Sequence, residues 1–147
     1  MSNSFQIFKD VLTNNYFNFS GRVNRPGYWH FILWSIIIWF ALFVLDILLF
    51  GFNEDFNLLS DIWNLAIAIP SLGLAARRYH DTNRTGWWLF IPAIPLVPSF
   101  IFLGLELEVL FIIFLFLAIL LGIWAFILLC LKGDPENNKY GPCTKKI

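Results

Sequence analysis

A short polar segment, residues 77–88, interrupts a chain that is otherwise mostly apolar. It reads RRYHDTNRTGWW and contains three arginines, one histidine and one aspartate. Two interpretations fit these residue types. In the first, the arginines bind an anionic ligand, because paired N–H groups of a guanidinium match the oxygens of phosphate or carboxylate. In the second, the segment orients a membrane protein, since basic residues mark the cytoplasmic side and tryptophan seats a helix at the membrane surface.

The two interpretations assign different roles to the same side chains. For orientation, Arg77 and Arg78 would end the preceding membrane span by holding lipid phosphate, and Asp81 would accept from an arginine or cap the turn. For binding, the arginines would act together with Arg84, His80 and Asp81. The orientation interpretation explains the basic residues, but it does not require a histidine beside an aspartate. The sequence leaves both interpretations open.

The composition indicates the kind of protein that positions this segment. The chain has 147 residues, of which 59% are hydrophobic and 14% are charged, whereas soluble domains average about 45–50% apolar and about 25% charged residues. An integral membrane protein is therefore predicted, and the length suggests a single domain over residues 1–147. The formal net charge is zero, which argues against nucleic-acid binding, because that requires a basic excess.

Four stretches are long and apolar enough to cross a membrane as helices, which takes about 20 residues each. The predicted spans are residues 29–50, 56–76, 87–103 and 109–131. Tight connections at residues 51–55 and 104–108 predict that the spans form two antiparallel hairpins. The predicted fold is an all-α membrane protein with four transmembrane helices.

A short amphipathic helix is predicted before the first span. Phe5, Phe8 and Leu12 recur at helical spacing, with polar residues between them. This pattern is typical of a helix that lies in the membrane interface with its aromatic face down. A helix docked on the cytoplasmic ends of the bundle would show the same pattern.

The distribution of charge predicts the orientation. In a four-span arrangement all ten lysines and arginines lie on one side, before span one, between spans two and three, and after span four. Among charged residues the opposite side holds acids, namely Glu54, Asp55, Glu106 and Glu108, together with Asp61 near the start of span two. Because short basic loops stay cytoplasmic, both termini are predicted to be cytoplasmic.

Asp46, late in span one, is an acid within an apolar run. It lies 17 residues beyond Trp29, about 25 Å along a helix, and so near the outer surface. Level with it on the next span we expect Asp61 and Asn64. We expect Asp46 to reach water or to form a hydrogen bond across the hairpin rather than to carry protons or cations.

Two more polar segments share the predicted cytoplasmic side, FSGRVNRPGYW at residues 19–29 and KGDPENNKYGP at residues 132–142. In chain order, the three polar segments contain Gly-Arg, Arg and Tyr-Trp, then Arg-Arg-x-His-Asp with Gly-Trp-Trp, and then Asn-x-Tyr-Gly-Pro. This series of motifs resembles the domain of unknown function 805 family of small bacterial inner-membrane proteins. The resemblance covers about residues 16–142, with mild departures such as Tyr79 where leucine is expected. It implies a helical inner-membrane fold, and it implies no reaction.

The three polar segments are expected to form one cluster, because short segments at one end of a small bundle must lie close together. The cluster would organise the bundle, or bind anionic lipid headgroups or a partner protein such as a second copy or another membrane protein. Its candidate residues are Arg22, Arg25, Tyr28, Arg77, Arg78, His80, Asp81, Arg84, Asn138 and Tyr140.

Three functions from different classes follow from these observations. The leading one is a non-enzymatic inner-membrane protein whose cytoplasmic cluster organises the bundle and binds anionic lipid or a partner. The alternative is a small oligomeric transporter or channel subunit, because prolines interrupt span three and broken helices can mark transport sites. An enzyme that uses His80 and Asp81 on a lipid-linked substrate ranks last, since paired carboxylates, a nucleophile motif and metal-ligand spacing are missing. No catalytic residue, metal site or cofactor is predicted.

Overall fold

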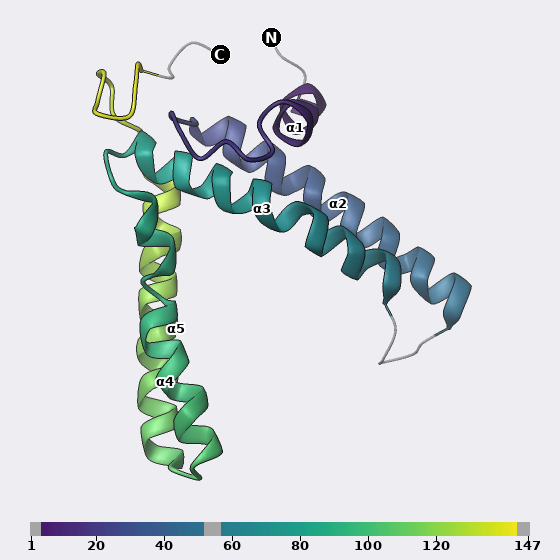
Figure 1. Ribbon diagram of the computed structural model, residues 1–147, viewed down its shortest axis with the longest axis vertical. Helices are drawn as coiled ribbons and strands as arrows, with labels where there is room; N and C mark the ends of the chain where they lie inside the picture. Colours follow the sequence, from purple (N-terminus) through teal and green to yellow (C-terminus); the bar gives the residue numbers. More distant parts are fainter. Residues whose placement is uncertain (1–3, 52–56, 144–147) are drawn as a thin grey trace.

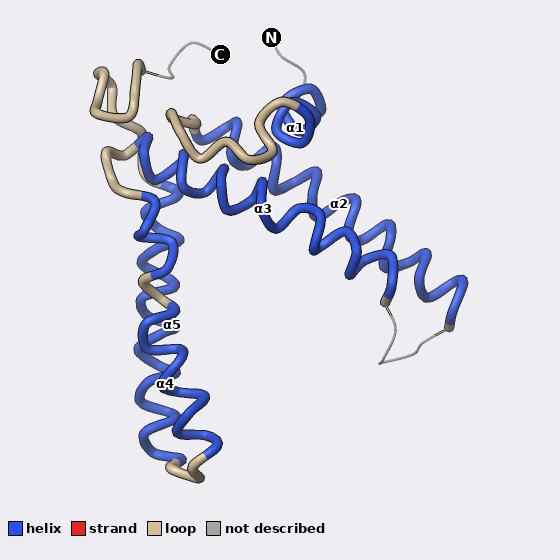
Figure 2. The backbone as a smooth tube through the Cα atoms, in the orientation of Figure 1, coloured by secondary structure: helices blue, strands red, loops and turns tan. Residues whose placement is uncertain are grey.

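The structure is a computed structural model, and it describes residues 4–51 and 57–143. The secondary structure of these residues is helical (Figure 2), apart from an isolated bridge between Asn138 and Gly141. The elements are α1 (Ser4–Thr13), α2 (Arg25–Phe50), α3 (Leu58–Asp81), the 3-10 helix η1 (Gly86–Phe90), α4 (Ala93–Gly104) and α5 (Glu108–Cys130).

The prediction of four helices long and apolar enough to cross a membrane is confirmed. The segments long and apolar enough to cross a membrane are Arg25–Phe50, Leu58–Asp81, Gly86–Gly104 and Glu108–Cys130. They form two antiparallel hairpins, α2–α3 and α4–α5 (Figure 1). The predicted connection at residues 51–55, with Glu54 and Asp55, lies largely outside the described residues.

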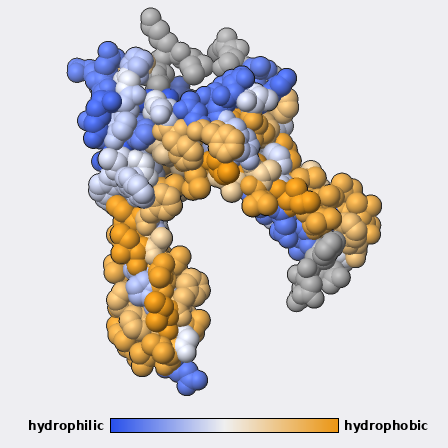
Figure 3. All heavy atoms as spheres, in the orientation of Figure 1, coloured by the Kyte–Doolittle hydropathy of each residue, from blue (hydrophilic) through white to orange (hydrophobic). Residues whose placement is uncertain are grey.

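The two hairpins splay apart like the arms of a V and meet at one end (Figure 1). At this end, which we call the junction, the last turns of α3 lie against α5 and the first turn of α2 lies beside them. The segment after α5 lies at the same end (Figure 1). Apolar residues cover most of both arms and polar residues gather around the junction (Figure 3). This is expected for arms surrounded by lipid and a junction in contact with water.

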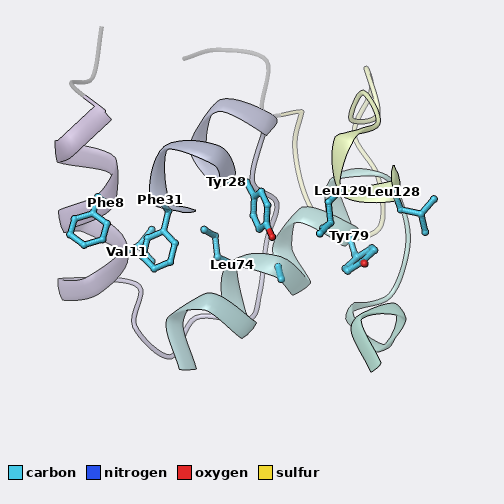
Figure 4. Packing of buried hydrophobic residues seen from close by; sticks show 9 residues of the cluster. Phe8, Val11, Tyr28, Phe31, Leu74, Tyr79, Leu128 and Leu129 are labelled. Atoms are coloured by element: carbon cyan, nitrogen blue, oxygen red, sulfur yellow. The ribbon is translucent and has the colours of Figure 1, made fainter. Parts of the chain in front are cut away.

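A small buried core joins four of the helices. It contains Phe8 and Val11 of α1, Tyr28 and Phe31 of α2, Leu74 and Tyr79 of α3, and Leu128 and Leu129 of α5 (Figure 4). Large apolar side chains along the arms are instead exposed, for example Leu48 at 75% and Leu65 at 77%. Lipid tails are as apolar as leucine, so such side chains have a suitable solvent in the membrane.

Helix α3 continues beyond residue 76, where the sequence predicts that span two ends. Helix α3 continues to Asp81 and therefore includes Arg77 and Arg78, both of which are buried. Arg78 meets protein partners in the last turns of the helix, whereas Arg77 lies at a cavity. Span one begins four residues earlier than predicted, since the side chain of Asn24 caps α2 by accepting from the Gly27 N–H at 2.9 Å.

Helix α1 is docked on the α2–α3 hairpin. Its buried Phe8 packs on Phe31 and Trp63, with ring centroids 5.5 and 6.3 Å apart. The predicted short amphipathic helix is therefore present, and its apolar face contacts protein. Phe5 packs edge-on against Trp34 but stays 46% exposed, so part of the aromatic surface remains available to the membrane.

Prolines divide the third span. The 3-10 helix η1 ends at Phe90, and α4 begins at Ala93, directly after Pro92. Proline lacks the N–H that would continue the helical hydrogen-bond ladder, so the turn at Ile91–Pro92 separates the two parts. The break lies partway along the arm, and η1 lies between it and the junction (Figure 2).

Asp46 caps α3 across the hairpin. Its two carboxylate oxygens accept the backbone N–H groups of Leu59 at 3.0 Å and Ser60 at 2.9 Å. The first N–H groups of a helix lack partners within it, and a carboxylate there is favoured by the helix dipole. The predicted hydrogen bond across the hairpin is confirmed, but the expectation that Asp46 reaches water is wrong, because it is 1% exposed.

Candidate functional site

The cluster at the junction is built around the Asp81 carboxylate on the last turn of α3. Arg78, three residues earlier, donates from Nη1 to Oδ2 at 2.5 Å. Arg22, from the loop before α2, donates from Nε to Oδ1 at 3.0 Å. The side chains in these two ion pairs are at most 3% exposed. A buried carboxylate between two arginines is satisfied by charge and by hydrogen bonds together.

Arg78 ties three segments together. Its Nε donates to the Leu129 carbonyl at 3.0 Å, its Nη2 donates to the Leu131 carbonyl, and its Nη1 also approaches the Val23 carbonyl at 3.4 Å. The last carbonyls of a helix lack partners within it, so the end of α5 attracts the guanidinium. The expectation that Arg78 holds lipid phosphate is therefore wrong, because its donors are occupied by the protein.

Arg22 attaches the C-terminal segment to the same carboxylate. Its Nη1 donates to the Glu136 carbonyl and its Nη2 to the Asp134 carbonyl, each at 2.7 Å. The Asp134 N–H in turn donates to the Asp81 carbonyl at 2.7 Å. Gly133 lies so close that a Cβ there would be 1.9 Å from Asp81 Oδ2, so this approach requires glycine.

His80 belongs to the same arrangement through stacking. Its ring lies 3.8 Å from that of Tyr140, with 5° between the planes. Its Nδ1 is 3.1 Å from the Gly21 carbonyl, and the Asn138 side chain donates to the His80 carbonyl at 2.9 Å. The histidine beside an aspartate thus has a packing role, since it seats the C-terminal segment on the end of α3.

Six of the ten candidate residues are joined in one network, namely Arg22, Arg78, His80, Asp81, Asn138 and Tyr140. Tyr28 is buried in the adjoining core. Arg25 is exposed on the first turn of α2. Arg84 donates within its own turn, to the Thr82 carbonyl at 3.3 Å.

Arg77 differs from its neighbour Arg78. It is 7% exposed, and its Nε and Nη2 atoms have no hydrogen-bond partner among the described residues. It lines a cavity of about 360 Å³ between α1, the following loop and α3. The structure therefore separates two adjacent arginines, one inside the network and one facing a cavity.

Sequence reasoning missed several residues that hold the junction. The Tyr79 hydroxyl donates to the Ala125 carbonyl of α5 at 3.1 Å, and Gly133 and Asp134 complete the contact with Asp81. A buried tyrosine needs a hydrogen-bond partner, but the sequence could not name a backbone carbonyl 46 residues away.

The described residues, 4–51 and 57–143, contain no group of three or more histidine, cysteine or acidic side chains placed to hold a metal ion. Asp81 already accepts from two arginines, and His80 is stacked between the loop and the C-terminal segment. The arrangement fastens segments together, and beside it the Arg77 side chain lies buried at a cavity.

Comparison with known proteins places the chain among bacterial membrane proteins. It is 32% identical over 135 residues to the inner membrane protein YhaH of Escherichia coli (strain K12), covering 89% of this chain and 90% of the relative. It is 29% identical over 136 residues to the inner membrane protein YhaI of the same strain, covering 92% of each. No solved structure matches the chain significantly. Residues 16–142 match the family described as protein of unknown function DUF805, and the chain belongs to that family.

Proposed function

We propose that this is a non-enzymatic inner-membrane protein with both termini in the cytoplasm, in which the junction cluster holds two membrane hairpins together and anionic lipid headgroups bind at the same end. The location is supported by the relatives, which are named inner membrane proteins. The orientation is supported by charge, since the eight lysines and arginines among the described residues fall on the junction side of the four spans.

The observation that carries the proposal is the shared Asp81 carboxylate. It accepts from Arg22 and Arg78, and these arginines also bind carbonyls before α2, at the end of α5 and in the C-terminal segment. Groups satisfied in this way are unsuited to acid–base chemistry, which needs a proton donor or acceptor free to meet a substrate. They are well suited to fixing how the hairpins meet.

Lipid binding is supported by basic side chains at the junction that do not take part in the Asp81 network. Arg25 is exposed on the first turn of α2 and Lys139 is exposed in the C-terminal segment. Two donors of Arg77 have no acceptor among the described residues. Basic groups at the cytoplasmic membrane surface attract anionic lipid, at about 1 kcal/mol for each lysine or arginine. The junction end therefore favours anionic over zwitterionic lipid.

The test compares two lipids on the purified full chain in mild detergent. Phosphatidylglycerol is expected to raise the unfolding temperature more than phosphatidylcholine of the same chain length, and native mass spectrometry should detect bound anionic lipid. Equal stabilisation by both lipids would contradict the lipid part of the proposal. Solute or ion flux through liposomes that contain the protein would instead support a transporter or channel.

A further inference from the structure

The side edge of the Arg77 guanidinium is buried, and no atom of residues 4–51 or 57–143 accepts a hydrogen bond from it. The two unpartnered atoms, Nε and Nη2, lie on the same edge of the group, and the residue is only 7% exposed. This edge presents two parallel N–H bonds, the geometry that grips two oxygens of one phosphate or carboxylate. Leaving such donors unsatisfied costs free energy, so an acceptor from outside the described chain is expected there.

The cavity beside Arg77 has room and a suitable lining for an anion. Its volume of about 360 Å³ falls within the range of roughly 300–1,000 Å³ that is common for ligand sites. Polar side chains of Gln6, Arg22 and Asn24 line it together with apolar Ile7 and Leu74. A mixed lining of this kind suits a charged group attached to a short carbon skeleton.

One acid lines the same cavity. The carboxylate of Asp10 accepts the side-chain amides of Asn14 and Asn15, each at 2.8 Å. Within the described residues the ion pairs closer than 4.0 Å are those of Asp81, so Asp10 does not neutralise Arg77 directly. Asp10 nevertheless repels an incoming anion, because it lines the same cavity and like charges oppose each other.

We propose that this cavity binds one phosphate group, gripped by the Nε and Nη2 edge of Arg77. The inference deepens the proposed function, on which it rests, because it names the residue that holds the anionic headgroup. The phosphate can belong to a glycerophospholipid or to a soluble phosphate ester, since the oxygens that Arg77 recognises are the same. Water alone could also satisfy the two donors, and it would leave the protein indifferent to phosphate.

The decisive variant is Arg77→Lys, measured on the full chain purified in mild detergent. Lysine keeps the positive charge but loses the parallel pair of N–H bonds. We expect phosphatidylglycerol to bind roughly tenfold more weakly or worse, because a charge-assisted hydrogen bond is lost, and its stabilising effect to shrink accordingly. The matched control is Arg84→Lys, which changes an arginine that donates within its own turn and should keep the wild-type response.

A second variant keeps the test informative if Arg77→Lys does not fold. Asp10→Asn removes the acid of the cavity without changing its size, and it should strengthen phosphatidylglycerol binding severalfold. Unchanged or weaker binding in Asp10→Asn would overturn the site. So would a wild-type phosphatidylglycerol response in Arg77→Lys, and in that case the headgroup binds elsewhere and the proposed function stands.

Glycerol 3-phosphate, added to delipidated protein, separates the two sources of phosphate. An Arg77-dependent rise in unfolding temperature with phosphatidylglycerol alone assigns the site to lipid. The same rise with glycerol 3-phosphate alone assigns it to a soluble ester and contradicts the lipid part of the proposed function. If neither compound stabilises the wild-type protein, both the site and the lipid part of the proposed function are wrong.

Discussion

Asp81 lies between two guanidinium groups, and each of these also donates to backbone carbonyls of other segments. A carboxylate in this position joins α3 to α5, to the loop before α2 and to the C-terminal segment. Removing one member of a buried ion pair leaves the other charged and without its partner. This lowers the free energy of unfolding more than the loss of an exposed ion pair does. At the scale of single residues, the junction therefore depends on Asp81 and its two arginines.

A double-mutant cycle measures this dependence. Asp81→Ala should lower the free energy of unfolding in detergent by about 3–5 kcal/mol, because it leaves a buried arginine unpaired. Arg78→Ala combined with Asp81→Ala should cost less than the two single changes added together, by about 0.5–3 kcal/mol. Additive losses would show that the 2.5 Å contact between the two side chains does not stabilise the protein.

At the scale of elements, side chains of one helix cap unpaired backbone groups at the end of another. The first N–H groups of α3 are capped by Asp46 from α2, and the last carbonyls of α5 are capped by Arg78 from α3. Unpaired backbone groups are expensive away from water, so these side chains set where the helices begin and end. The α4 helix has no side-chain cap and begins directly after Pro92.

The Asp46 cap can be tested by hydrogen exchange. Asp46→Asn keeps one carbonyl oxygen but loses the second acceptor and the charge, so the amides of Leu59 and Ser60 should exchange faster and the unfolding temperature should fall. Asp61→Asn is the matched control. Asp61 lies in the first turn of α3, beside Leu59 and Ser60, and its side chain is exposed. Equal effects from the two substitutions would mean that Asp46 contributes no specific cap.

At the scale of the whole molecule, two apolar arms diverge from one polar junction (Figure 3). The core that holds them lies at the junction (Figure 4), while the arms present exposed apolar side chains to their surroundings. Lipid around and between the arms would solvate these surfaces. The charge distribution predicts the orientation in the membrane, with the junction facing the cytoplasm.

Thiol labelling from outside the cell tests this orientation. In a variant whose Cys130 and Cys143 are replaced by serine, a membrane-impermeant reagent should label Leu107→Cys, because Leu107 lies in the turn at the far end of α4–α5. Lys139→Cys, at the junction end, should react only after the membrane is permeabilised. Labelling of Lys139→Cys in intact cells would show that the protein is inserted the other way.

The class of protein, the number of spans and their pairing into hairpins were predictable from the sequence. Apolar length and composition are properties of each segment alone, and the short connections leave adjacent spans little choice of partner. The grouping of Arg22, Arg78, His80, Asp81, Asn138 and Tyr140 was also predictable, because the four-span arrangement brings their three segments to one end.

Only the tertiary structure decided what each polar residue does. Arg77 and Arg78 are adjacent and chemically identical, but successive residues on an α-helix point about 100° apart. Arg78 therefore meets Asp81 and the end of α5, while Arg77 faces the cavity beside α1. Asp46 likewise meets the first N–H groups of α3 because of how the two helices pack, and the sequence does not specify which partners a folded neighbour will present.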